Sequence, residues 1–253
     1  MACLWYYRRQ KITAMETLVN KVIEAHGGMQ RWQDLNKVDV TLVSGGKLFD
    51  LQGQPQDATP RQMSVFLHEQ RASMKPYGGP DRQTNFSPGR IAIETTDGKV
   101  LSERTGAVEE LHNHMKANGW DAIDRAYFNG YAMWTYLTTP FFMIMPGIAI
   151  AEIAPWSQDH ESWQGLRVTF PPNISTHSVV QDFYFGKDYL LRRHDYYIDV
   201  AGDFEATQYV YDYTEVGGIK LPTKRLAYKK GTDGLPIKDE LMVHIDFSNI
   251  RFS

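Results

Sequence analysis

The spacing of apolar residues along the chain predicts a helix at the start. A capping box made by Thr13 and Glu16 precedes a run of apolar positions at helical spacing, Leu18, Val19, Val22 and Ile23. Gly27-Gly28 then favours the end of the helix, because glycine adopts the left-handed conformation at little cost. A short helical turn from Trp32 to Leu35 is expected to follow.

The period changes to two after this helix, which predicts β-strands. The alternation runs through "KVDVTLVSGGKLFDLQG", with a turn at Gly45-Gly46, through "RQMSVFLHEQ" and through "RIAIETTDGKVLSERT". Asp97-Gly98 lies between two alternating stretches and predicts a β-hairpin. The polar stretch "EELHNHM", with His112 and His114, is interpreted as a surface loop rather than as a metal site, since the His-x-His spacing alone is weak evidence.

A helix is predicted in the middle of the chain, from the cap residue Asp121 to the residue before Pro140. It carries one broad apolar stripe, formed by Ile123, Tyr127, Phe128, Tyr131, Trp134 and Leu137. The next segment, "TTPFFMIMPGIAIA" (Thr138 to Ala151), contains two prolines and no charged residue. It is interpreted as a lid over a binding cavity, with a buried core segment and a docking surface as alternatives.

Strands return from Ile148 and continue to the C-terminus. They are "LRVTFP", "SVVQDFYFG", "YLLRRHDYYIDV", "EATQYVYDYTEV", "IKLPTKRLAYKKG" and "DELMVHIDFSNI", with only short turns between them. Parallel strands need long crossovers, so these form an antiparallel meander. The predicted fold is mainly β with helices (α+β), an antiparallel curved sheet around the N-terminal helix and the central helix–loop lid. One domain is expected over residues 13–253, after an N-terminal extension of residues 1–12.

This order of elements resembles the LolA/LolB-like lipoprotein carriers and uncharacterised bacterial proteins of the same fold. The resemblance lies in the leading helix that ends in "AHGG", and in "VTFPPNISTHSVVQDFYFGKDYLLRRHDYY" and "GIKLPTKRLAY". It implies a half-barrel whose concave, apolar face takes acyl chains. The chain departs from the carriers because no export signal is recognised at its start, and a cytoplasmic protein is therefore expected.

Alternation also predicts which side chains line the inside of the curved sheet. The inward sets are expected to be Val179, Gln181, Phe183 and Phe185; Leu190, Arg192, His194, Tyr196 and Ile198; Thr207, Tyr209, Tyr211 and Tyr213; and Leu241, Val243, Ile245 and Phe247. Arg193 and Asp195 are expected to face solvent. Apolar walls with a few converging polar groups are typical of a ligand site.

Two functions follow from this interior. The first is a protein that binds an apolar or amphipathic small molecule, with the ligand contacts Trp134, Phe141, Phe142, Met143, Met145, Gln181, Phe183, Phe185 and Tyr196. The alternative is a cofactor-independent isomerase, cyclase or hydro-lyase in the same cavity. There His194 would act as acid or base, Arg192 would stabilise charge, and Tyr209 or Tyr211 would donate to an oxyanion.

Composition narrows the partners. The chain has 253 residues and a net charge of −3, so it has no positive electrostatic field that would attract nucleic acid. A single cysteine, Cys3, excludes a disulfide within one chain, and neither a cofactor motif nor a metal-binding motif is recognised. No stretch has the roughly 20 apolar residues of a membrane helix. The expected partner is therefore a hydrophobic small molecule, without cofactor or metal.

Overall fold

The computed structural model describes residues 17–253, so the predicted extension and the capping box of Thr13 and Glu16 lie outside the described part. The helices are α1 (Leu18–Ala25), α2 (Met29–Gln33), α3 (Lys47–Leu51), α4 (Val108–Asn118) and α5 (Ala122–Thr138), with a 3₁₀ turn η1 (Phe141–Ile144). The first strands are β1 (Lys37–Gly45), β2 (Arg61–Phe66), β3 (Ala72–Lys75), β4 (Arg82–Ser87), β5 (Arg90–Thr95) and β6 (Val100–Thr105). The remaining strands are β7 (Ala149–Gln158), β8 (Glu161–Thr169), β9 (Val180–Phe185), β10 (Leu191–Ile198), β11 (Phe204–Val216), β12 (Ile219–Lys230) and β13 (Pro236–Phe252).

All the strands belong to one antiparallel sheet, in the order β6-β5-β4-β3-β2-β1-β13-β12-β11-β10-β9-β8-β7. Two meanders meet where the first strand pairs with the last, Val38 opposite Phe252 and Leu42 opposite Phe247. The outer strands β6 and β7 do not pair, so the sheet curves without closing into a barrel. The predicted fold class, mainly β with helices in a curved half-barrel, is confirmed.

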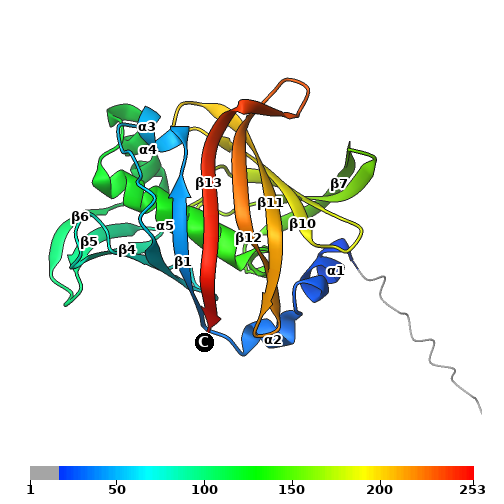
Figure 1. The fold of residues 1–253 in the computed structure, drawn as a ribbon, viewed down its shortest axis with the longest axis horizontal. Coiled ribbons are helices and arrows are strands. Elements are labelled where there is room, and N and C mark those ends of the chain that lie inside the picture. The colour runs from blue at the N-terminus through cyan, green and yellow to red at the C-terminus, as the bar shows by residue number, and fades with distance from the viewer. Residues whose placement is uncertain (1–16) are drawn as a thin grey trace, which may run out of the picture.

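The helices α4 and α5 lie on the concave side because of this strand order. The chain leaves the sheet at one edge, β6, and returns at the opposite edge, β7, so the segment between them has to cross one face. Figure 1 shows α5 running behind the sheet across that face. Its 17 residues reach about 25 Å, and its side chains are buried on nearly all sides. A helix enclosed in this way needs the broad apolar stripe that the sequence predicts.

Local sequence signals explain where α5 begins and ends. Asp121 caps the helix, its Oδ1 accepting from the Asp124 N–H at 2.9 Å, while Asp124 Oδ2 accepts from the Asp121 N–H at 3.0 Å. Pro140 has no N–H to continue the backbone ladder, and the helix ends at Thr138. The predicted hairpin at Asp97-Gly98 is confirmed as the β5–β6 turn, with Gly98 at φ 93°.

Two predicted segments differ from the structure. Residues 47–51 form the short helix α3 rather than a strand, and they bury Leu48 and Phe49. The stretch "EELHNHM" lies in helix α4 rather than in a loop. Glu110 begins this helix by accepting from the Ala107 N–H at 2.9 Å, and Leu111 and Met115 are its buried positions.

Candidate functional site

The concave face of strands β8–β13 carries an almost continuous apolar layer, with α5 and η1 packed against it. This layer buries most of the residues proposed as ligand contacts, namely Trp134, Phe141, Phe142, Met143, Phe183, Phe185 and Tyr196. Phe142 joins η1 to the sheet, because its ring packs on Phe170 at 5.3 Å and on Phe183 at 5.9 Å between centroids. Phe141 stacks on Trp32 of α2 at 4.1 Å. Met145 is only partly buried at the edge of the layer.

Side chains fill this interior. Between α5 and the sheet the structure leaves a space of only about 10 Å³, lined by Phe128, Met133, Tyr136 and Tyr196 among others. The expectation of an open cavity is therefore wrong for this conformation. The segment interpreted as a lid is buried from Thr138 to Met143 and reaches the surface at Ile144, so it occupies the cup rather than covering an empty one.

A buried arginine, Arg225 on β12, interrupts the apolar layer. Its Nη1 donates to Gln208 Oε1 at 2.9 Å and its Nη2 donates to the backbone oxygen of Tyr136 at 2.8 Å. Burial lowers the pKa of Arg225 to about 10, so the side chain stays charged at neutral pH. No carboxylate within residues 17–253 pairs with this guanidinium. Its contact with the Tyr136 carbonyl places it at the last turn of α5, the negative end of the helix dipole.

The contact with Tyr136 has a cause in the sequence. The Tyr136 carbonyl would normally accept from the residue four positions later, but that residue is Pro140, which has no N–H. Arg225 supplies the missing donor. The guanidinium therefore ties β12 to the last turn of α5 across the apolar layer.

From Arg225 a directed chain of hydrogen bonds crosses the interior. Because Gln208 accepts from Arg225 through Oε1, its Nε2 donates to Tyr196 Oη at 3.4 Å. Tyr196 Oη lies 3.2 Å from Tyr136 Oη, which lies 2.8 Å from His177 Nε2. The assignment that gives each hydroxyl proton an acceptor has Tyr196 donating to Tyr136 and Tyr136 donating to His177. Burial lowers the pKa of His177 to about 3, so the ring is neutral. With Nε2 as acceptor, its single ring proton lies on Nδ1.

His194 lies next to this chain, as predicted, on the concave face. It stacks on Phe183 at 4.1 Å, and its Nε2 lies 2.6 Å from Gln181 Oε1. Gln181 Nε2 donates to the Ser178 carbonyl at 2.9 Å, which leaves its Oε1 to accept from His194. Burial lowers the pKa of His194 well below its usual value, so Nε2 carries the proton and Nδ1 is bare.

The inward placement of Arg192 is wrong, because a bulge interrupts the alternation. Leu191 pairs with Phe185 and Arg193 pairs with Tyr184, so Arg192 is the extra residue of β10. Its side chain is partly exposed and donates to Asp188 at 2.6 Å. Because of this bulge, the alternation that places His194 on the concave face does not place Arg192 there.

The inward placement of Tyr209 and Tyr211 is also wrong. His194 is opposite Gln208 and Arg193 is opposite Tyr209, so the concave face of β11 carries Gln208 rather than the tyrosines. Tyr211 is exposed on the convex side. Tyr213 does lie inside, its ring 6.1 Å from that of His26, beyond an irregularity at Asp212 with φ 56°.

Arg193 and Asp195, expected in solvent, are buried on the convex face. The Arg193 guanidinium meets Asp195 through two hydrogen bonds of 2.6 Å and lies 4.0 Å from the Trp156 ring centroid. Tyr209 covers the pair and contacts Trp163 and Tyr184 in a second small core. Tyr209 therefore covers a structural ion pair. The acid–base set proposed for the enzyme alternative, His194 with Arg192 and Tyr209 or Tyr211, is not assembled around His194.

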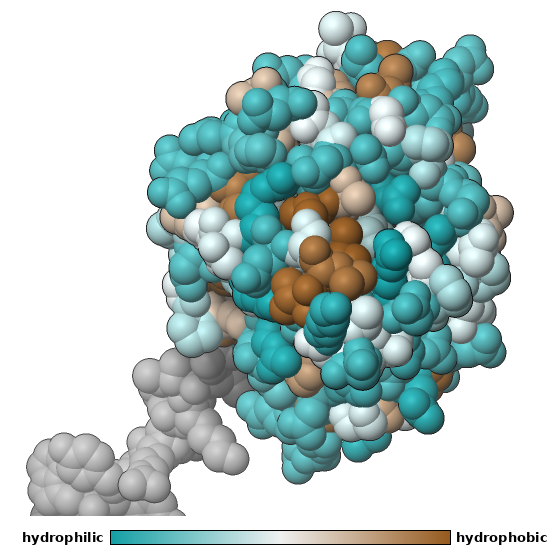
Figure 2. Space-filling model, turned by 90° about the vertical axis from the view of Figure 1, so that its left-hand side faces the viewer, coloured by the Kyte–Doolittle hydropathy of each residue, from teal (hydrophilic) through white to brown (hydrophobic). Residues whose placement is uncertain are grey.

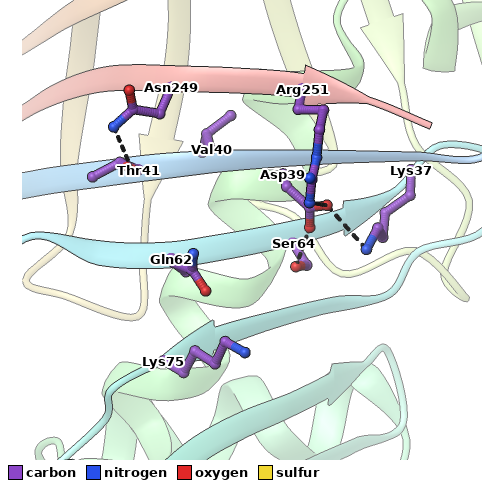
Figure 3. A pocket seen from close by; sticks show the side chains of 9 residues that line it. All are labelled: Lys37, Asp39, Val40, Thr41, Gln62, Ser64, Lys75, Asn249 and Arg251. Atoms are coloured by element: carbon purple, nitrogen blue, oxygen red, sulfur yellow. Dashed lines mark hydrogen bonds and ion pairs between the residues drawn. The ribbon is translucent and has the colours of Figure 1, made fainter.

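A polar groove of about 440 Å³ lies on the convex face of β13, β1, β2 and β3 (Figure 3). Its one carboxylate, Asp39, is already paired. Asp39 accepts from Ser64 at 2.5 Å and pairs with Lys37 at 3.0 Å and Arg251 at 3.4 Å. A cluster of His114, Asp121 and Asp124 at the start of α5 has metal-ligand residue types, but Arg104 already pairs with both carboxylates. Neither place offers an unpaired buried group.

The sequence interpretation did not single out Arg225, Gln208, Tyr136 or His177. Two signals for Arg225 were present: it alternates with Leu221 and Ala227 on the apolar face of "LPTKRLA", and Pro140 leaves a helical carbonyl without a donor. The pairing of β12 with β11, which brings Arg225 to Gln208, is a tertiary fact and leaves no local pattern.

The chain matches known proteins in structure but not in sequence. No protein-family model and no curated protein matches the sequence. A LolA superfamily protein from Nitrosomonas europaea aligns with a TM-score of 0.53 at 11% identity, covering 93% of both chains. An outer membrane lipoprotein-sorting protein domain from Vibrio parahaemolyticus gives 0.54 at 8% identity, over 93% of this chain and 91% of that one. A DUF1329 family protein from Desulfovibrio piger gives 0.51 at 11% identity, over 93% and 92%.

The expected cytoplasmic location is wrong in light of these matches. One matched structure is named as an outer membrane lipoprotein-sorting protein domain, which contradicts this expectation. Among the described helices, none is long and apolar enough to cross a membrane. The curved antiparallel sheet with its crossing helix and the three structural matches lead to one conclusion: the protein has the LolA-like fold.

Proposed function

We propose that the protein binds an apolar or amphipathic lipid-like molecule on the concave face of β8–β13, after α5 and η1 move away from it. The observation that carries the proposal is the apolar layer itself, together with a buried guanidinium that has no carboxylate partner among residues 17–253. The matched LolA superfamily and lipoprotein-sorting structures support this function by analogy of fold.

The attachment of α5 favours such a movement. The helix packs closest against β2–β6, and polar contacts anchor it there. Trp134 Nε1 donates to the Phe66 and Glu69 carbonyls, Tyr127 donates to the Pro88 carbonyl, and Arg104 pairs with Asp124. Toward β9–β13 the polar contacts of α5 run through Tyr136. Separation on this side breaks few hydrogen bonds and exposes mainly apolar surface, which a lipid chain can cover.

Arg225 would change partners in this movement. Opening removes the Tyr136 carbonyl from the guanidinium and leaves a buried cation facing the emptied layer. A buried charge without a partner is costly. An anionic head group in the same place restores the pairing through charge-assisted hydrogen bonds. The ligand class that fits is therefore a long-chain molecule with a carboxylate or phosphate end.

Replacing Arg225 by Met tests the proposal through two effects of opposite sign. The variant cannot pair with an anion, so its affinity for oleate should fall by about tenfold or more, the worth of a charge-assisted hydrogen bond. It also lacks the tie to Tyr136, so oleyl alcohol should bind as well as before or more tightly. Isothermal titration calorimetry of the two ligands against both proteins measures the difference.

Arg167→Met is the matched control, since Arg167 is exposed and paired with Asp182 at 2.8 Å on the other side of the sheet. It should leave both affinities unchanged. Failure of the wild-type protein to bind either ligand, or an equal loss of oleate and oleyl alcohol affinity in Arg225→Met, contradicts the proposal. Thermal unfolding of each variant separates binding effects from loss of the fold.

A further inference from the structure

Two hollows of the surface outside the concave layer differ in chemistry. Beside α4, apolar side chains gather within a polar surround, as Figure 2 shows from that side of the molecule. The groove on the convex face of β13, β1, β2 and β3 has a volume of about 440 Å³ and is lined mainly by polar and charged side chains (Figure 3). Three of these are cations and one is a carboxylate: Lys37, Lys75, Arg251 and Asp39. The groove therefore carries a net positive charge within a chain whose net charge is −3.

The pairing of the strands brings the charged side chains of the groove to one face. Ser64 of β2 and Arg251 of β13 both pair with Asp39 of β1. Lys37 lies two positions before Asp39 and so points to the same face of the sheet. A bulge at Asn249, where φ is 50°, bends β13 next to Arg251, and bulges often border active sites. The charges are therefore held by paired strands rather than by a loop.

Two cations of the groove converge on one oxygen. Lys37 Nζ lies 3.0 Å and Arg251 Nη2 lies 3.4 Å from Asp39 Oδ2. Desolvation raises the pKa of Asp39, but the hydrogen bonds from Ser64 and Lys37 outweigh it and lower the pKa below its usual value, so the carboxylate is ionised at neutral pH. Because both nitrogens lie within reach of a single carboxylate oxygen, one anionic group on the solvent side of Asp39 can contact both of them.

Further donors of the groove are free within residues 17–253. The Lys75 ammonium forms no ion pair there, and the side-chain amide of Gln62, opposite Lys75 on β2, forms no hydrogen bond. Figure 3 shows the ammonium end of Lys75 directed toward the part of the groove that holds Ser64 and Asp39. The Arg251 side chain is 77% exposed. These donors are exposed rather than buried, so an anion can reach them from solvent.

The charges and donors select a phosphate group. A cationic ligand would be repelled by the positive excess, and a neutral ligand would not use it. A carboxylate brings one charge and two oxygens, whereas a phosphate monoester carries about 1.5 to 2 negative charges at pH 7 and three acceptor oxygens. Arginine and lysine side chains from neighbouring strands match this set of acceptors. A groove of about 440 Å³ favours a small soluble molecule over a membrane surface.

We propose that this groove binds the phosphate group of a small soluble phosphate monoester, held over Asp39 by Lys37 and Arg251, with Lys75 adding charge from β3. The site lies on the convex face and needs no movement of α5. Because the cations are exposed, each of them should contribute at most about fivefold to the affinity. Binding should also weaken as salt is added, since salt screens exposed charges.

Titration of the ¹⁵N-labelled protein with glycerol 3-phosphate, acetate and glycerol, followed by NMR, tests the proposal. Glycerol 3-phosphate should shift the side-chain amide signals of Gln62 and Asn249 and bind several-fold more tightly than acetate, while glycerol should shift neither. Arg251→Gln should weaken phosphate binding by about fivefold. Lys99→Gln removes an exposed lysine at the β5–β6 turn, outside the groove, and should bind glycerol 3-phosphate like the wild type.

Asp39→Asn should change the affinity in the opposite direction, because it removes the negative charge beneath the phosphate, and binding should tighten by about fivefold. Unchanged or weaker binding in Asp39→Asn, equal losses in Arg251→Gln and Lys99→Gln, or no shift at the groove in the wild type overturns the proposal. Binding to vesicles containing phosphatidic acid without binding of glycerol 3-phosphate also overturns it, since the partner would then be a membrane surface. Oleate affinity should match the wild type in these variants, so this result is independent of the concave layer.

Discussion

At the scale of single residues, the two buried histidines of the interior should hold opposite tautomers. The hydrogen-bond chain makes His177 Nε2 an acceptor, while Gln181 makes His194 Nε2 a donor. Burial lowers the pKa of both rings, so both stay neutral at pH 7. Long-range ¹H–¹⁵N NMR distinguishes protonated from bare ring nitrogens and should show Nδ1–H for His177 and Nε2–H for His194.

A Tyr136→Phe variant provides the control for this assignment. It deletes the donor to His177 Nε2, so the His177 tautomer is no longer fixed and its signals should change, while those of His194 should not. If His177 carries its proton on Nε2 in the wild type, the assigned direction of the chain is wrong.

Residue patterns predicted part of this interior. Alternation correctly placed Phe183, Phe185 and His194 on the concave face, because β9 and the end of β10 are regular. It failed at Arg192, where the bulge adds a residue, and in β11, where Tyr209 covers the buried ion pair of Arg193. Bulges and the burial of a convex face depend on neighbouring strands, and the sequence carries no local signal of either.

At the scale of elements, the packing of α5 on β4 depends on one missing side chain. Gly130 faces Phe86, and a Cβ built at Gly130 would come within 2.4 Å of the Phe86 ring. Ala in a helix gains about 1 kcal/mol over Gly, but overpacking a core costs about 1–3 kcal/mol or more. Gly130→Ala should therefore destabilise the protein, as measured by urea unfolding, despite its better helix propensity.

The loss should depend on the size of residue 86. In a Phe86→Ala background the same Gly130→Ala change should cost less, because Cγ and Cδ2 of the ring, two of the three nearest contacting atoms, are gone. A double-mutant cycle measures this coupling. Additive effects in the cycle would show that Gly130 serves another purpose than the close approach of α5 to β4.

The two central helices differ in how far the sequence reveals them. α5 was predicted with its cap at Asp121 and its end before Pro140, since both signals are local and its apolar stripe is broad. α4 was missed because Leu111 and Met115 are its only buried positions. A helix that buries one narrow edge has too few apolar residues to show a period.

At the scale of the whole molecule, the uninterrupted run of late strands was enough to predict an antiparallel meander curved around helices, and the resemblance to the LolA/LolB-like carriers implied a half-barrel. The central pair β1–β13 joins residues about 200 positions apart and could not be inferred from spacing. The filled interior could not be inferred either. A meander indicates that a concave face exists, but the segment that occupies it is decided by which edges the chain leaves and re-enters.

Stability of the whole molecule should fall steeply in mild acid, because three histidines are buried and a fourth, His112, is half-buried, all as neutral rings. Burial lowers the pKa of His26 and of His112 to about 4, that of His177 to about 3, and that of His194 well below its usual value. Unfolded histidine titrates near 6.5, so below that pH the unfolded state binds more protons and the free energy of unfolding falls. Each ring should lower the free energy of unfolding by about 1 kcal/mol between pH 7 and 5.5, before most carboxylates titrate.

Urea unfolding at several pH values measures how steeply the free energy of unfolding falls with pH. His112→Gln should reduce it by about one proton, while His160→Gln, at an exposed turn, should leave it unchanged. A flat profile down to pH 5.5 would mean that these rings are hydrated in the folded protein, and that the interior is already open to water.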